Sequence, residues 1–257
     1  MTLPGCLTAD IGREVIAADE RTEANDCLSP AKRGIVLSFD DSINIDSWNE
    51  SRPLFEQYNA TATFFVDRWD DLTSEEIEIL RVLKEEGHEI GFHGTNHRDY
   101  FQFTDGEKNE SDYFHEEIIP GLTTMRGLGF NATSYAYPLG SREPVIDKLL
   151  LEEFVALRGV NSRPNGSHPW ITDCLDFGVY RALHLKTEVN NQSSLDYKNK
   201  QITMADELLL AGNYTLNIFG HGIGKGNYVA SNETLVEVLE MANKHNLTYL
   251  NFSELGY

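Results

Sequence analysis

The chain has 257 residues, of which 40% are hydrophobic, and its formal net charge is -20, from 21 basic and 41 acidic residues. This length fits one α/β barrel-sized domain or two small ones, and the apolar content is sufficient for a full core. The acidic excess argues against binding to nucleic acid or to anionic membrane surfaces, because both require basic patches. No apolar stretch of about 18 residues, the length that a membrane-spanning helix needs, is present, so no membrane span is expected.

Residues 1–33 are polar and mixed in charge. We expect them to form a poorly ordered N-terminal extension ahead of one domain over residues 34–257. They contain no apolar segment of the kind found in a signal peptide. The three cysteines, Cys6, Cys27 and Cys174, form no Cys-x-x-Cys motif, so a zinc ribbon or a thioredoxin-type site is not supported. Two possibilities remain open: one disulfide with one free thiol, or three free thiols.

Acceptor sequences for N-glycosylation, Asn-x-Ser/Thr, occur at 10 of the 19 asparagines. About two or three would be expected by chance from the frequency of serine and threonine. We therefore expect a chain that passes through a glycosylating secretory route and is extracellular or at the cell surface. A bias toward these residues in loops is the alternative. The acceptors are Asn49, Asn59, Asn109, Asn131, Asn165, Asn191, Asn213, Asn232, Asn246 and Asn251.

Strands and helices are predicted to alternate along the chain. Apolar or β-branched runs predict strands at residues 35–40, 61–66, 88–93, 133–137, 154–160, 177–185, 214–219 and 248–252. Amphipathic spacing predicts helices at residues 48–58, 73–87, 110–128, 201–211 and 231–245. The second of these helices opens with a capping-box pattern, Thr73 to Glu76. Such alternation indicates parallel βα units in a barrel or a doubly wound sheet.

Two adjacent acids, Asp40 and Asp41, follow directly after the apolar run of the first predicted strand. In a parallel α/β barrel the carboxyl ends of the strands form the active-site face. Two neighbouring carboxylates repel each other, which favours a position where a cation or a proton transfer uses them. A turn or a helix N-cap is the alternative interpretation of the Asp-Asp-Ser sequence.

Histidines follow two later strands: His93 and His97 come after the third predicted strand, and His221 comes after the seventh. Two histidines four residues apart can bind one metal ion from one side of a turn. Because the carboxyl ends of parallel strands meet on one face, we expect Asp41 to join them in a metal site with open positions for water and substrate. Asp40 would stay outside the ligand set, close enough to take a proton from that water.

With these motifs the chain resembles the polysaccharide deacetylases with the NodB homology domain, carbohydrate esterase family 4. The family motif Thr-Phe-Asp-Asp-Gly is matched by residues 38–42, and His-Ser/Thr-x-x-His by the two histidines four residues apart. The strand-end Leu-x-His motif is similar to residues 219–221, and Arg-x-Pro-Tyr is met in part by residues 136–139. The resemblance covers the chain from residue 33 onward and implies a distorted (β/α) barrel, usually of seven parallel strands.

The resemblance implies a metal-dependent hydrolase that removes N-acetyl or O-acetyl groups from chitin, peptidoglycan or poly-N-acetylglucosamine. By correspondence with the family motifs, Asp41, His93 and His97 hold a divalent metal, most often zinc. Asp40 is the implied general base, and His221 is the implied general acid that protonates the departing amine. These roles meet what amide hydrolysis needs, which is a strong nucleophile, stabilisation of the oxyanion and a proton for a poor leaving group.

The same resemblance implies that Tyr137, Pro138 and Leu139 form part of a substrate groove. A backbone N–H near Leu139 would assist the metal in stabilising the oxyanion. The implied partner is an acetylated polysaccharide or oligosaccharide.

The chain departs from the family pattern at two places that bear on catalysis. Gly94 replaces a Ser/Thr whose hydroxyl steadies the His-x-x-x-His loop, and Thr95, one place later, is a candidate substitute. Ala136 stands where the family has the arginine that pairs with the catalytic base. Arg158 or Arg181 could supply that charge from another strand.

The family's aspartate that orients the catalytic histidine has no convincing match, and Asp173 and Asp176 are only candidates. One alternative is therefore a non-catalytic, carbohydrate-binding relative that keeps the metal site. Another is a hydrolase of a small amide or imide on the same fold. A third is an Fe(II) oxygenase that uses His97, Asp99 and a distant histidine, but such sites usually lie on an all-β double sheet and the predicted helices argue against it.

Overall fold

A computed structural model describes residues 29–30, 33–160, 171–172, 174–175, 178–184, 215–225 and 229–256. The strands are β1 (Ser29–Pro30), β2 (Gly34–Asp40), β3 (Thr63–Val66), β4 (Glu89–Phe92), β5 (Ser134–Ala136), β6 (Ala156–Val160), β7 (Ile171–Thr172), β8 (Cys174–Leu175), β9 (Gly178–His184), β10 (Thr215–Gly220), β11 (Gly222–Ile223), β12 (Val229–Ala230) and β13 (Thr248–Leu250). The helices are α1 (Ile45–Tyr58), α2 (Ser74–Glu85), α3 (Tyr100–Phe103), α4 (Glu110–Tyr113), α5 (Ile119–Gly127), α6 (Pro144–Leu150) and α8 (Asn232–Lys244), with a π-helical segment, Phe114–Ile118, between α4 and α5.

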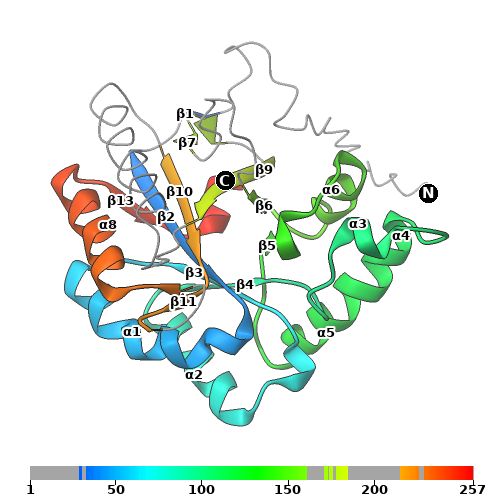
Figure 1. The fold of residues 1–257 in the computed structure, drawn as a ribbon, viewed down its shortest axis with the longest axis horizontal. Helices are drawn as coiled ribbons and strands as arrows, with labels where there is room; N and C mark the ends of the chain where they lie inside the picture. Colours follow the sequence, from blue (N-terminus) through cyan, green and yellow to red (C-terminus); the bar gives the residue numbers. More distant parts are fainter. Residues whose placement is uncertain are drawn as a thin grey trace, which may run out of the picture.

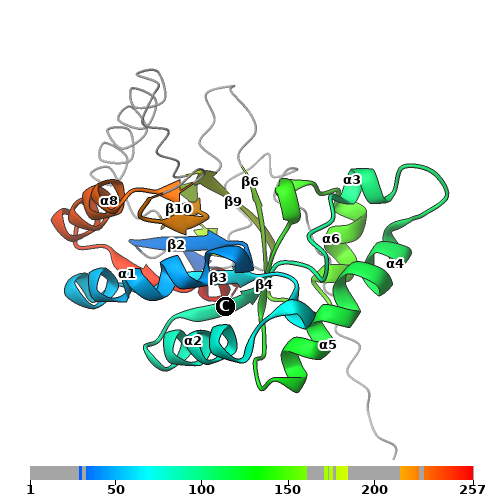
Figure 2. The same cartoon turned by 60° about the horizontal axis from the view of Figure 1, so that its bottom comes forward.

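Seven of the described strands close into a ring of parallel pairs (Figures 1 and 2). The order is β2, β3, β4, β5, β6, β9 and β10, and β10 pairs again with β2. The barrel is distorted at β2, since β13 pairs with its first residues, Gly34 to Val36, and β3 pairs with its last, Ser38 to Asp40. The predicted distorted barrel of about seven parallel strands is confirmed.

Helices cover the outside of the barrel, with α1, α2 and α8 on one side and α3 to α6 on the other (Figure 1). The capping box of α2 is present, with Thr73 accepting from the Glu76 N–H and the Glu76 carboxylate accepting from the Thr73 N–H. One prediction was wrong in detail, because the helix expected at 110–128 is divided by the π-helical segment. The short helices α3 and α6 were not expected. None of the helices in the described ranges is both long and apolar enough to span a lipid bilayer.

Several predictions concern residues outside the described ranges. These are the helix at 201–211, most of the N-terminal extension with its two cysteines, the candidates Asp173 and Asp176, and the acceptors Asn165, Asn191 and Asn213.

Side chains of β2 alternate between the two faces of the barrel wall, as the pleat of a strand requires. Ile35, Leu37 and Phe39 pack in the large core between the sheet and the helices. Val36 belongs to the smaller core inside the barrel, and Ser38 and Asp40 follow it at the same spacing of two. The alternation therefore directs the first acid of the Asp-Asp pair into the barrel interior.

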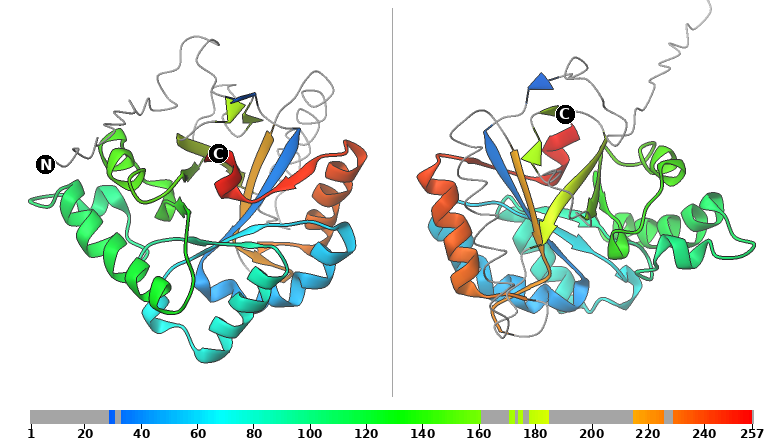
Figure 3. Two further views of the ribbon diagram at one scale, coloured as in Figure 1. Left: turned by 180° about the vertical axis from the view of Figure 1, so that it is seen from behind. Right: turned by 45° about the horizontal axis from the view of Figure 1, so that its top comes forward.

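The amino ends of the strands are closed by the C-terminal 3-10 turn, Phe252–Gly256 (Figure 3). Within this closure the carboxylate of the half-buried Glu89 accepts hydrogen bonds from Ser134 Oγ, Thr63 Oγ1 and the Ser253 N–H, at 2.7, 3.0 and 2.9 Å. Burial raises the pKa of Glu89, and these donors oppose the shift. This polar network and the C-terminal turn therefore cover the amino ends of the strands. The carboxyl ends remain available for a functional site.

Candidate metal centre

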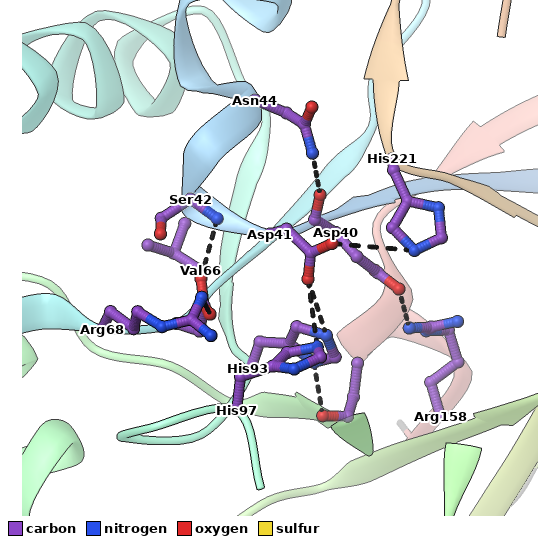
Figure 4. A network of polar contacts seen from close by, with 12 residues as sticks. Asp40, Asp41, Ser42, Asn44, Val66, Arg68, His93, His97, Arg158 and His221 are labelled. Atoms are coloured by element: carbon purple, nitrogen blue, oxygen red, sulfur yellow. Dashed lines mark hydrogen bonds and ion pairs between the residues drawn. The ribbon is translucent and has the colours of Figure 1, made fainter. Parts of the chain in front are cut away.

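Asp41, His93 and His97 meet at the carboxyl ends of β2 and β4 (Figure 4). Asp41 Oδ1 lies 3.4 Å from His93 Nε2 and 3.2 Å from His97 Nε2. One oxygen and two imidazole nitrogens from three side chains therefore approach a common point, and each is a common metal ligand atom.

Two of these three residues have backbone conformations that L-amino acids seldom adopt. Asp41 has φ 73° and ψ 119°, and His97 has φ 57°. Residues held in sparsely populated regions cost on the order of 1–3 kcal/mol each and are concentrated at functional sites. These positive-φ conformations turn the chain at the end of β2 and after β4, so that the Asp41 and His97 side chains face each other.

The donor set fits a divalent metal ion. His93 Nδ1 lies 2.8 Å from the Ala136 carbonyl oxygen, which can only accept a hydrogen bond. Nδ1 therefore carries the proton, and Nε2 presents its lone pair toward Asp41. Asp41 Oδ1 is buried and makes no hydrogen bond of good geometry within the described part of the chain. Electron-rich atoms that face one another in this way are suited to a cation between them.

Electrostatics at this cluster favour an ionised carboxylate. Burial alone would raise the pKa of Asp41, but the adjacent imidazoles of His93 and His97, together with His221, hold it far below its usual range. Burial opposes charging of His93, yet Asp40 and Asp41 raise its pKa. The Asp41 carboxylate is therefore ionised, as a metal ligand must be.

Asp40 points away from this cluster and into the barrel, where it pairs with the Arg158 guanidinium (Figure 4). Both side chains are buried. Arg158 lies on β6 directly opposite Ala136 of β5 in the parallel register. Its guanidinium stacks over the Phe219 ring at 4.4 Å, so that it is held from both sides. Arg158, which is in register with Ala136 on the neighbouring strand, thus pairs with Asp40.

His221 follows β10 and lies on the other side of Asp41, with Nε2 3.7 Å from Asp41 Oδ2 (Figure 4). Its carbonyl oxygen accepts a hydrogen bond of 2.8 Å from Trp48 Nε1 on α1, which fixes the end of the strand. Burial lowers the pKa of His221, Arg158 acts in the same direction, and Asp40 and Asp41 oppose them. The histidine is therefore a readily deprotonated group beside the cluster.

Asp67 supports the site and was missed from the sequence. Its buried carboxylate accepts the Ser42 N–H at 2.8 Å and pairs with Arg68. This hydrogen bond anchors the backbone just after Asp41. Asp67 directly follows β3, so the strand-end reasoning that identified Asp41 could also have identified it.

The three predicted groove residues lie in different environments. The Tyr137 ring is buried, and its hydroxyl donates to Asp147 Oδ1 at 2.6 Å, so direct contact between this side chain and a substrate does not fit its position. Pro138 is also buried, beside Gly94 of the histidine loop. Leu139 is 65% exposed and has φ 57°. Of the three side chains, only Leu139 is available to a ligand.

Comparison with known proteins agrees with this geometry. The family model described as polysaccharide deacetylase matches residues 28–152, which include Asp40, Asp41 and both histidines of the cluster. Over these residues, which are just under half of the chain, the sequence matches the polysaccharide deacetylase family. Members of this family are generally metal-dependent, in keeping with the donor set described above.

Two solved structures share the fold. A carbohydrate esterase family 4 esterase from Streptococcus mutans has a TM-score of 0.54 at 15% identity, over 86% of this chain and 86% of that chain. The peptidoglycan deacetylase PdaC from Bacillus subtilis has a TM-score of 0.51 at 17% identity, over 89% of this chain and 92% of that chain. A gellan lyase from a Bacillus species is 32% identical over 133 residues, which are 50% of this chain and 5% of the lyase. The chain therefore spans a small part of that relative's length.

The strain at Asp41 predicts a difference in stability between two substitutions at this position. Asp41→Gly and Asp41→Ala both remove the carboxylate, but only alanine keeps a Cβ at φ 73°. After allowance for the greater freedom of glycine in the unfolded chain, we expect Asp41→Gly to be more stable than Asp41→Ala by about 1 kcal/mol. Chemical denaturation of both metal-free proteins measures the difference. An alanine variant that is equally stable would contradict the assignment of strain.

Proposed function

We propose that the chain is a metal-dependent deacetylase that removes N-acetyl or O-acetyl groups from a polysaccharide such as chitin, peptidoglycan or poly-N-acetylglucosamine. The observation that carries the proposal is the division of the Asp-Asp pair. Asp41 faces two imidazole nitrogens, while Asp40 faces a buried guanidinium. Asp41 is thereby suited to hold a cation, and Asp40 is fixed by an arginine beside it, where it can take part in proton transfer.

The proposed cofactor is a divalent ion, specifically Zn²⁺, since two imidazoles and one carboxylate are a common set of ligands for catalytic zinc. Asp41, His93 and His97 would hold it. When bound, such an ion polarises an acyl oxygen and makes a water molecule more acidic. The histidine tautomer that this requires is the one favoured by the His93 contact with the Ala136 carbonyl.

Asp40 is the proposed general base. Its Oδ2 is paired with Arg158, while its Oδ1 is buried and has no hydrogen-bond partner within the described ranges. The ion pair with Arg158 fixes the Asp40 carboxylate and leaves its second oxygen free to accept a proton, as a general base must. Arg158 on β6 therefore provides the positive charge beside Asp40 that Ala136 cannot provide.

His221 is the proposed general acid, on the opposite side of Asp41 from the two other histidines. It donates a proton to the departing amine or alcohol, which is otherwise a poor leaving group. The backbone N–H of Leu139, in the strained loop beside the histidines, is the proposed second stabiliser of the oxyanion.

Exposed apolar side chains beside the site support a carbohydrate substrate. Ile43, two residues after Asp41, is 85% exposed, and Leu139 is 65% exposed. Sugar rings present C–H faces, and burying apolar area against them is favourable. These two side chains would contact the sugars next to the one that carries the acetyl group.

Substitution of each aspartate tests the division of roles. Asp40→Asn should keep stoichiometric metal, while acetate release falls by about 100- to 10,000-fold, because only the proton acceptor is lost. Asp41→Asn should lose both metal and activity when the metal concentration is limiting. Elemental analysis beside an acetate-release assay measures both quantities. An Asp40→Asn protein that turns over near the wild-type rate would mean that the base is misassigned.

The substrate is identified by acetate release from chitin oligomers, peptidoglycan, poly-N-acetylglucosamine and acetylated xylan. Release from at least one of them is expected. A chain that binds metal and these glycans without releasing acetate would instead be a carbohydrate-binding relative. A chain that acts only on small amides or imides would be a different hydrolase on the same fold.

We also propose that the protein is extracellular or at the cell surface and carries N-linked glycans. Seven acceptor asparagines lie in the described ranges, and none of them is buried. Asn59, Asn131 and Asn246 precede β3, β5 and β13, at the amino ends of the strands and opposite the metal centre. Glycans there would leave the proposed active site accessible.

Peptide mass mapping of the protein from its native host tests this localisation. Glycans are expected on the exposed Asn59, Asn131 and Asn246. Asn251 should be modified least, because its side-chain amide donates to the Gly87 carbonyl at 3.1 Å. Unmodified peptides at all acceptor positions would contradict the proposal.

A further inference from the structure

The loop that carries the second histidine, residues 94–98, has no regular structure of its own between β4 and α3. It turns through two residues with positive φ, Gly94 at 92° and His97 at 57°. Such a loop places His97 accurately only if other parts of the molecule hold its backbone. The contacts that do so come from the helical segment between α4 and α5.

Glu117, in the π-helical segment, contacts the peptide groups on both sides of His97. Its Oε1 accepts the N–H of Asn96 and the N–H of Arg98, each at 2.9 Å. Its Oε2 accepts from Asn96 Nδ2 at 3.2 Å. The Glu117 residue is 0% exposed, so these hydrogen bonds lie away from solvent. A buried carboxylate that accepts several N–H groups is a strong, charge-assisted anchor.

Thr95 inserts into the helix at the same place. Its hydroxyl donates to the Glu117 carbonyl at 2.9 Å and accepts the Gly121 N–H at 2.8 Å. In an uninterrupted α-helix these two backbone groups, four residues apart, would bond to each other. Insertion of a side chain into this ladder is a known cause of helix distortion, and the π-helical segment lies here.

Two glycines allow this close approach. A Cβ on Gly94 would lie 2.7 Å from Glu117 Oε1, and a Cβ on Gly121 would lie 2.8 Å from Thr95 Oγ1. Any larger residue at 94 would therefore displace the carboxylate. This explains why the chain has glycine where the family motif has Ser or Thr: the Glu117 carboxylate and the Thr95 hydroxyl supply the anchoring bonds from neighbouring positions.

We propose that Glu117 is a positioning residue for the metal centre: it fixes the loop that presents His97 to Asp41. This inference rests on the proposed function, because it assumes that His97 binds the ion. Removing a residue that orients a metal ligand, without binding the metal itself, typically lowers metal affinity by about 10- to 100-fold. Glu117 acts on His97 through the two flanking peptide groups, and it does not contact the ion.

Glu117→Met tests the inference, because methionine has a similar length but accepts no comparable hydrogen bonds. Glu116→Met is the matched control, since Glu116 is adjacent and half-exposed and pairs only with the surface cations Lys108 and Arg98 among the described residues. Zinc affinity, measured by competition with a chromophoric chelator, should fall by about 10- to 100-fold in Glu117→Met and stay unchanged in Glu116→Met. Visible absorption of bound Co²⁺ should also change in Glu117→Met alone.

Two further variants keep the test decisive if Glu117→Met fails to fold. Glu117→Gln retains one oxygen that can accept both N–H groups, so we expect its affinity to stay within a few-fold of wild type. Thr95→Val keeps the shape but removes the inserted hydroxyl, so we expect an intermediate loss. Circular dichroism and thermal unfolding of the metal-free proteins establish that each variant is folded.

The outcomes separate the inference from the proposed function. A wild-type chain that binds no ion overturns the proposed function and this inference with it. A wild-type chain that binds zinc, beside a folded Glu117→Met protein of equal affinity, overturns the inference alone. Equal losses in Glu116→Met and Glu117→Met would also overturn it, because the effect would then be one of net charge.

Discussion

Two neighbouring carboxylates end one buried strand, and the site is organised by the separate partners that each of them has. Adjacent like charges repel each other unless opposite charges or hydrogen-bond donors are placed beside them. The pleat of β2 directs Asp40 into the barrel, where Arg158 pairs with it, and the turn after β2 directs Asp41 outward to His93 and His97. The two acids thereby acquire different surroundings, and different chemistry becomes available to each.

This compensation depends on the closed barrel. Arg158 comes from β6, His93 from the end of β4 and His221 from the end of β10, while β2 lies between β3 and β10 in the ring. A buried guanidinium without its carboxylate would be strongly unfavourable, so the ion pair and the closure of the barrel support each other. The strained backbone of Asp41 is tolerated because Asp67 and the surrounding strands fix the chain on both sides.

The strand-end residues could be identified from the sequence because parallel strands present their carboxyl ends on one face. The alternation of elements indicated either a barrel or a doubly wound sheet, and the resemblance to the deacetylase family indicated the barrel. Arg158 could not be chosen over Arg181, since that choice depends on the register that places Arg158 opposite Ala136. The burial of Tyr137 depends on its hydrogen bond to Asp147 on α6. This helix is too short to show a clear hydrophobic period in the sequence.

Glu117 was not identifiable for a related reason. It lies among polar residues in a stretch that reads as one continuous helix, where a glutamate is ordinarily solvated. Only the insertion of Thr95 into that helix brings the carboxylate against the histidine loop. Contacts that arise when two separately predictable elements interlock cannot be derived from the pattern of either one.

The central claim is that hydrolysis depends on an ion held by Asp41, His93 and His97. The most direct measurement is acetate release from an acetylated glycan by the wild-type chain after removal of metal with a chelator, and again after addition of Zn²⁺ in increments. Acetate release is expected to fall to background without metal and to return in proportion to bound zinc, reaching its maximum near one ion per chain. Full acetate release by a protein that elemental analysis shows to be metal-free would contradict it.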